Sequence, residues 1–106
     1  MIVFKVKLPD GEVQPVCVFD HTSEGALGDY VVIAAAIDRI DAIDLVAALQ
    51  AVAGGFGGLG SDEETLSVCH TVLLQNLDSN EFFVPAMAVV ATASYIRKNL
   101  RAVTRS

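Results

Sequence analysis

Residues 27–37, with the sequence LGDYVVIAAAI, decide between two architectures for this chain. The β-branched run Val31-Val32-Ile33 favours a strand, because side chains branched at Cβ fit a pleated sheet well. The three alanines that follow favour a helix. Apolar residues also recur here at the helical spacing of three and four, at Leu27, Val31, Ala34 and Ile37. Weighing these signals, we favour a helix and keep a third strand as the alternative.

The residues before this stretch have the pattern of a β-hairpin. Apolar side chains occupy every second position from Ile2 to Leu8, which is the period of a half-buried strand. Pro9-Asp10-Gly11 predicts a turn, and the β-branched run at residues 13–19 predicts the second strand. Pro15 has no backbone N–H, so it indicates an edge position or a late start for that strand.

After the central stretch, three further helices are predicted, at residues 42–53, 62–77 and 84–102. Asp41 has the side chain of an N-cap for the first of these, and Gly54 is expected to end it. Ser61-Asp62-Glu63-Glu64 matches the S-x-x-E capping box and predicts the start of the second. Pro85 suits the first turn of the third. The first half of this helix is apolar or small on all sides, so the helix is expected at the centre of the core.

These elements predict an α+β fold, in which an N-terminal β-hairpin, or three strands in the alternative, packs against a layer of three or four helices. The 106 residues fit one compact domain, and no repeat or linker divides them. Residues 1–20 would form the hairpin, and residues 24–104 would be mainly helical.

The composition is apolar and acidic. Glycine and the residue types AVILMFWC fill 62 of the 106 positions, about 58%, against about 45–50% in typical domains. The net charge is -6, although residues 97–106 carry four basic side chains and no acidic one. The acidic remainder disfavours nucleic-acid binding. Arg97, Lys98 and Arg101 either stabilise the end of the last helix through its dipole or dock on the acidic surface of a partner.

Cysteine content and the start of the chain indicate a cytoplasmic location. The only two cysteines, Cys17 and Cys69, lie in apolar runs, and no charged segment followed by an apolar one opens the sequence. Each uninterrupted apolar stretch is far shorter than the roughly 18 residues that span a bilayer, so no membrane segment is expected.

Asp20, His21, Cys69 and His70 are the residues whose chemistry is worth testing. Two cysteines and two histidines supply the ligand types of a structural zinc site, but adjacent helical positions such as Cys69 and His70 point about 100° apart. A Cys–His nucleophile pair with Asp20 or Asp38 as orienting acid is the other arrangement considered. Burial of Cys69 would raise the pKa of its thiol and make it inert. We therefore expect no metal, no cofactor and no catalytic residue.

The glycine-rich residues 54–60 could in principle bind phosphate ahead of a helix. No Lys-Ser/Thr pair follows them, and the carboxylates of Asp62, Glu63 and Glu64 would repel an anion there. We interpret the segment as a mobile connector whose Phe56 and Leu59 contact a partner or close over a groove.

The function predicted from these features is that of a small acidic interaction or regulatory module that is not an enzyme and self-associates, with a dimer favoured. The apolar content exceeds what one small core requires. The candidate contact residues are Phe56, Leu59, Phe82, Phe83, Arg97, Lys98 and Arg101. Two alternatives stay open: a module that binds a small apolar ligand between the hairpin and the helices, and an acidic inhibitor that competes for a basic site on a partner protein.

Overall fold

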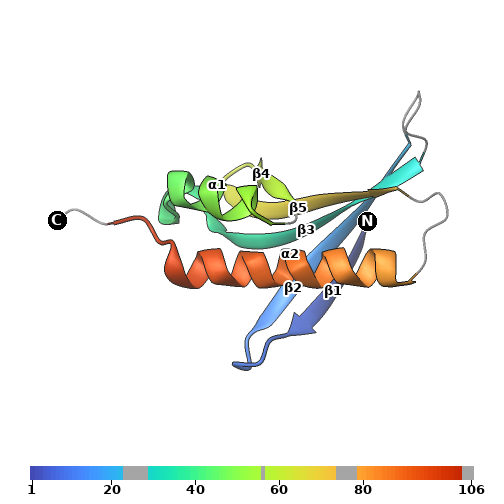
Figure 1. Cartoon of the computed structure of the whole chain (residues 1–106), viewed down its shortest axis with the longest axis horizontal. Helices are drawn as coiled ribbons and strands as arrows, with labels where there is room; N and C mark the ends of the chain where they lie inside the picture. The colour runs from blue at the N-terminus through green and yellow to red at the C-terminus, as the bar shows by residue number, and fades with distance from the viewer. Residues whose placement is uncertain (23–28, 56, 74–78, 104–106) are drawn as a thin grey trace.

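The described part of the chain forms a five-stranded antiparallel sheet with two α-helices on one face, as the computed structural model shows (Figure 1). The structure describes residues 1–22, 29–55, 57–73 and 79–103. Strand order across the sheet is β1-β2-β3-β5-β4, which places β3 at the centre. The elements in chain order are β1 (Ile2–Lys7), β2 (Val13–Thr22), β3 (Asp29–Arg39), the 3-10 turn η1 (Ile40–Ala42), α1 (Leu45–Ala53), β4 (Gly58–Asp62), β5 (Thr65–Leu73) and α2 (Ser79–Asn99).

The predicted N-terminal hairpin is confirmed. β1 pairs with β2 from Ile2 opposite Val18 to Lys7 opposite Val13. Gly11 lies in the turn with φ 90°, a left-handed conformation that glycine adopts without the steric penalty of a Cβ atom. β2 is not an edge strand, because its other side pairs with β3.

The α+β class is confirmed, but the prediction of a hairpin against three or four helices is wrong. Residues 27–37, for which we favoured a helix, contribute from Asp29 onward to the central strand β3. β2 and β5 supply hydrogen-bond partners on both sides of β3. These long-range ladders outweigh the helical preference of the three alanines, since strand propensity depends on neighbouring strands as much as on the segment itself.

The helix predicted at residues 62–77 is also wrong. β4 ends at Asp62, Glu63 and Glu64 form a two-residue turn, and β5 begins at Thr65. Glu63 has φ 54°, which lies outside the right-handed helical region. The buried residues of β5 fall at even positions, 66, 68 and 72, and thus have the period of a strand. Residues 74–77 of the predicted helix lie outside the described residues.

The other two predicted helices are confirmed, with different starts and, for the last helix, an end at Asn99 instead of residue 102. α1 begins at Leu45 and its N-cap is Asp44 rather than Asp41, with the Asp44 carboxylate accepting a hydrogen bond from the N–H of Ala47 at 3.2 Å. Gly54 caps its C-terminus, as predicted. α2 begins at Ser79, so Pro85 lies inside the helix instead of at its start. The described part of residues 24–104 thus contains the strands β3, β4 and β5 as well as the two helices.

The core lies between the helices and one face of the sheet. α2 crosses β2, β3 and β5, and α1 lies beside it on the side of β4 (Figure 1). The buried side chains of α2 are Ala86, Val89, Val90, Ala93 and Ile96, and those beneath it include Val16, Ile33, Ala35 and Val68. Among the described residues, no helix combines the length and apolar character that crossing a membrane requires.

Candidate interaction face

The face of the sheet opposite the helices is called the uncovered face below. On β3 it carries Val32, Ala34 and Ala36, the half-buried positions that alternate with the core residues. Cys17 of β2 and Cys69 of β5 stand directly opposite Ala34 in the two ladders that flank β3. Because opposed residues of an antiparallel pair project to the same side, these five residues share the uncovered face. Its other members include Lys5, Lys7, Pro15, Phe19, Gly60, Asp62, Thr65, Ser67 and Thr71.

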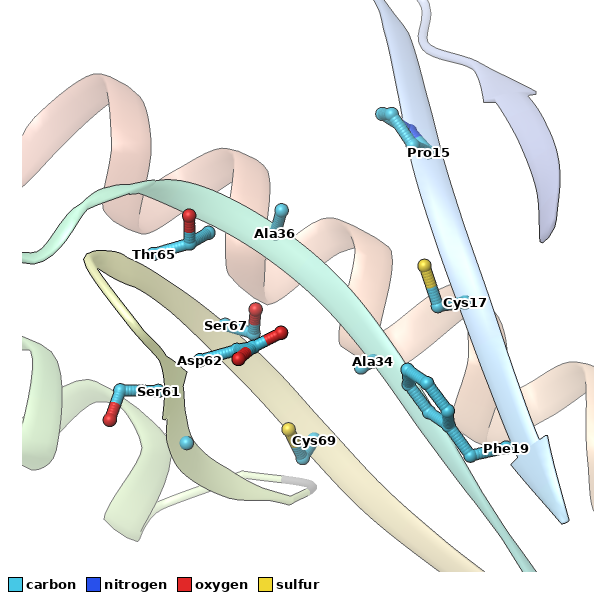
Figure 2. Close-up of a pocket in the computed structure, with 11 residues that line it drawn as sticks. Pro15, Cys17, Phe19, Ala34, Ala36, Ser61, Asp62, Thr65, Ser67 and Cys69 are labelled. Atoms are coloured by element: carbon cyan, nitrogen blue, oxygen red, sulfur yellow. The ribbon is translucent and has the colours of Figure 1, made fainter. Parts of the chain in front are cut away.

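A shallow hollow of about 310 Å³ lies in this face. Figure 2 shows Ala34 between Cys17 and Cys69, with α2 behind the sheet. Every residue that lines the hollow belongs to a strand, and most are small: Pro15, Cys17, Phe19, Ala34, Ala36, Gly60, Ser61, Asp62, Thr65, Ser67 and Cys69. Methyl, thiol and hydroxyl groups fill little space above the sheet, and Gly60 contributes no side chain. The hollow therefore follows from the small residues at its centre.

The central strand is apolar on both of its faces. An antiparallel sheet with one face in water normally alternates apolar and polar residues. In β3 no charged or amide side chain occurs from Tyr30 to Ile37. Such an unbroken apolar run is typical of a strand that is covered on both faces. The middle of the uncovered face thus has the composition of a buried surface.

The two edges of the uncovered face carry opposite charge. On β1, the exposed Lys5 and Lys7 lie opposite Pro15 and Val13 and so belong to this face. At the other edge, Asp62 ends β4, and the exposed Glu63 and Glu64 form the adjoining turn. Arg39 neutralises part of this charge, with its Nη1 atom 3.1 Å from Oε2 of Glu64. The face therefore runs from a basic edge through an apolar middle to an acidic edge.

The four residues selected for chemistry do not converge on one face. Asp20 and His70 lie opposite buried residues of β3 and belong to the helix-covered side, whereas Cys69 belongs to the uncovered face. His21 is in β2, but its side chain lies outside the described part of the structure. Within the described ranges, no group of three or more His, Cys, Asp or Glu side chains could hold a metal ion.

Both cysteines are thiols without a disulfide bond. Burial raises the pKa of the Cys69 thiol, as predicted, although Cys69 is on a strand and not on a helix. Since the thiolate is the reactive form, this shift makes Cys69 a poor nucleophile at neutral pH.

The basic residues near the C-terminus form contacts within their own chain. Arg97 donates to two backbone carbonyl oxygens of β3 at 3.1 and 3.2 Å. Lys98 pairs with Asp10, and Nη1 of Arg101 is 2.8 Å from Oδ2 of Asp38. Hydrogen bonds from Lys98 and Arg101 hold the pKa of the Asp10 and Asp38 carboxyls below the usual range. These contacts tie the end of α2 to the sheet.

The predicted apolar contact residues differ in accessibility. Phe83 is 58% exposed, whereas Phe82 is partly buried against the core and meets Phe83 edge to face, with ring centroids 5.7 Å apart. Leu59 lies in β4 and also packs against the core, so it is not part of a loose connector. Phe56 lies outside the described residues. The helical side exposes a second apolar set: Leu45, Val46, Leu49, Val84, Met87 and Tyr95.

Sequence reasoning missed the centre of the uncovered face, namely Cys17, Ala34 and Ala36. The signal that could have revealed it is the apolar character of both alternating sets of positions in residues 30–37. Comparison of the chain with protein-family models, with curated proteins and with solved structures gives no match. The function of this chain is therefore inferred from its own residues.

Proposed function

We propose that this chain is a non-enzymatic interaction module that self-associates through its uncovered face. The observation that carries the proposal is the apolar middle of that face, formed by Val32, Ala34 and Ala36 with Cys17 and Cys69 on either side. Removing apolar surface from water favours association. A second copy offers a face of the same size and chemistry, and it is present wherever the chain is.

The size of the uncovered face supports a dimer. Five strands about 4.8 Å apart, with a rise of about 3.3 Å for each of eight or so residues, give a flat area of roughly 650 Å². A stable interface of standard size buries about 800 Å² on each partner. The face is thus close to the area that a specific dimer needs.

Sedimentation equilibrium with two matched variants tests the proposal. Ala34→Glu places a carboxylate at the apolar centre of the uncovered face, and Leu49→Glu places the same group on the exposed side of α1, where Leu49 is 55% exposed. We expect the native chain and Leu49→Glu to be dimers and Ala34→Glu to be a monomer with an unchanged circular dichroism spectrum. If Ala34→Glu does not fold, Thr71→Lys, at an exposed position of the same face, replaces it.

Two results contradict the proposal. One is a native monomer at about 100 μM, since interfaces of standard size have dissociation constants of micromolar or below. The other is a dimer that Leu49→Glu dissociates and Ala34→Glu leaves intact, which would place the contact on the helices.

The hollow supports a second candidate function, the binding of a small apolar ligand. Its volume of about 310 Å³ lies at the lower end of the range of roughly 300–1,000 Å³ for ligand sites. In that case native mass spectrometry of the purified chain would show an additional mass, and Ala36→Leu, which fills the hollow, would remove it. A single mass equal to that of the chain or its dimer argues against this candidate.

A further inference from the structure

Two copies can stack face to face with two-fold symmetry in two ways, and the charges at the edges of the uncovered face distinguish them. If the symmetry axis runs across the strands, β1 lies antiparallel over β1 of the partner, so that each charged edge of the face overlies the edge of like charge. If the axis runs along the strands over β3, β1 lies over β4 of the partner. The basic edge then faces the acidic edge, and this contact occurs twice.

We propose that the dimer has its two-fold axis along β3, so that β1 covers β4 of the partner and β2 covers β5. This arrangement rests on the proposed function and defines its geometry. Lys7 and Asp62 lie at the same end of the sheet, where β3 ends. Lys7 pairs with the first residue of β2. Asp62 lies opposite Thr65, which pairs with Arg39, the last residue of β3. A rotation about an axis along the strands keeps each residue at its own end. Lys7 therefore meets Asp62 of the partner.

The register of the strand ladders also determines which cysteines face each other in the dimer. Cys17, Ala34 and Cys69 form one row across β2, β3 and β5, with Ala34 at the midpoint of β3. When β2 lies over β5 of the partner, Cys17 stands over Cys69 of the partner. Facing sheets cross at about 30°, which shifts residues one strand away from the axis by only about 2.5 Å along the strand.

The small residues in this row allow the two sheets to approach. Ala34 would lie over Ala34 of the partner, with no large side chain between the two central strands. Phe19, which is 37% exposed on β2, would lie over β5 of the partner, beside the hollow. Each copy thus presents its Phe19 ring to the side of the partner where small residues leave room.

Cross-linking of single-cysteine variants tests the arrangement in the full-length chain. Cys17→Ser retains only Cys69, and Cys69→Ser retains only Cys17. In a mixed dimer of the two variants, Cys17 of one copy lies over Cys69 of the other. In a dimer of either variant alone, the two identical thiols are two strand spacings apart, about 9.6 Å, in the plane of the sheet. The reagent is a bis-methanethiosulfonate with a one-carbon bridge, used near pH 8.5 because the pKa of the Cys69 thiol is raised.

We expect cross-linked dimers from the mixture after subunit exchange and at least fivefold less from either variant alone, with peptide mapping to identify the Cys17–Cys69 link. A cross-link in either variant alone that is as strong as in the mixture contradicts the arrangement. A dimer that Ala34→Glu dissociates but that gives no cross-link in any sample also contradicts it, and leaves the proposed function standing. A monomeric native chain contradicts both.

Charge reversal gives an independent readout of the same contact. Lys7→Glu and Asp62→Lys are each expected to raise the dissociation constant of the dimer about three- to tenfold, because two exposed pairs of modest strength are replaced by repulsion. The double variant restores opposite charges across the interface and should recover most of the native affinity. A double variant that binds no better than the single ones contradicts the arrangement.

Discussion

Arg97→Met tests the polar contact that anchors the end of α2 to the sheet. A β-bulge between Ala36 and Asp38 interrupts the ladder with β5, so carbonyl groups there need partners from outside the ladder. Arg97 donates to the oxygens of Ala36 and Ile37 at 3.1 and 3.2 Å. It also donates to Oε1 of Gln14 at 2.7 Å, and Gln14 is 1% exposed and itself donates to the Ala36 oxygen.

The expected loss of stability follows from the groups left behind. Methionine keeps much of the apolar stem of Arg97 but removes its donors. Ala36 retains the hydrogen bond from Gln14, whereas the Ile37 oxygen and Oε1 of Gln14 lose the donor that Arg97 supplied. A buried acceptor without a partner costs about 1–3 kcal/mol. Since the Arg97 side chain is 22% exposed and water can enter beside it, we expect the free energy of unfolding to fall by about 2–4 kcal/mol.

Urea unfolding at one fixed protein concentration measures this loss, with Lys98→Met as the matched control. Lys98 is the next residue in α2 and pairs with Asp10, but side-chain exposures of 39% and 41% limit the value of that pair to about 1 kcal/mol or less. Adding Gln14→Leu to Arg97→Met removes the orphaned Oε1 but also removes the donor to the Ala36 and Pro15 oxygens, so the double variant should regain no stability. A loss of stability in Arg97→Met no larger than that in Lys98→Met would show that the Arg97 contacts do not anchor α2.

Two further predictions concern a carboxylate and a glycine. The pKa of Asp38 is lowered mainly by its hydrogen bond from Arg101. The stability that the Asp38 carboxylate contributes is therefore present above the unfolded-state pKa of about 3.9, and it is lost as the pH falls through the lower folded-state pKa. Asp38→Asn should therefore be less stable than the native chain at pH 7 and equally stable well below that pKa, and a deficit that is the same at both pH values in urea titrations would contradict this. Gly57→Ala should be far more destabilising than Gly11→Ala in thermal unfolding: both have positive φ, but an added Cβ at Gly57 would lie 2.3 Å from a backbone carbonyl oxygen, whereas at Gly11 nothing lies within 4 Å. Equal melting temperatures would show that β4 moves to accept the methyl group.

The capping box at residues 61–64 shows why local signals failed in the second half of the chain. Ser61 and Glu64 have the spacing of a helix start, yet acidic and hydroxyl residues suit a tight turn equally well. The apolar residues of β5 are so frequent that they satisfy both the helical and the strand period. The choice depends on β3, which lies next to β5 in space but about 30 residues earlier in the chain. No window of local sequence contains that partner.

The candidate face was inaccessible to sequence reasoning for a related reason. Cys17, Ala34 and Cys69 come from three separate segments, and only the ladder register brings them into one row. Once residues 29–39 are known to form a strand, the apolar character of both of its sides can be read from the sequence. Placed on a helix, the same residues are interpreted as an ordinary core stripe.

The sequence alone determined the first hairpin, the end of α1 at Gly54 and the central role of α2, because each depends on signals within a few residues of one another. Alternating side chains, turn residues and an apolar helix are local properties. The tertiary structure decided the strands β3, β4 and β5, the pairing of Arg97 with the bulge, and the uncovered face. Those features depend on contacts between segments far apart in the chain. The neighbouring segments decide both which side chains are buried and which groups are hydrogen-bonded.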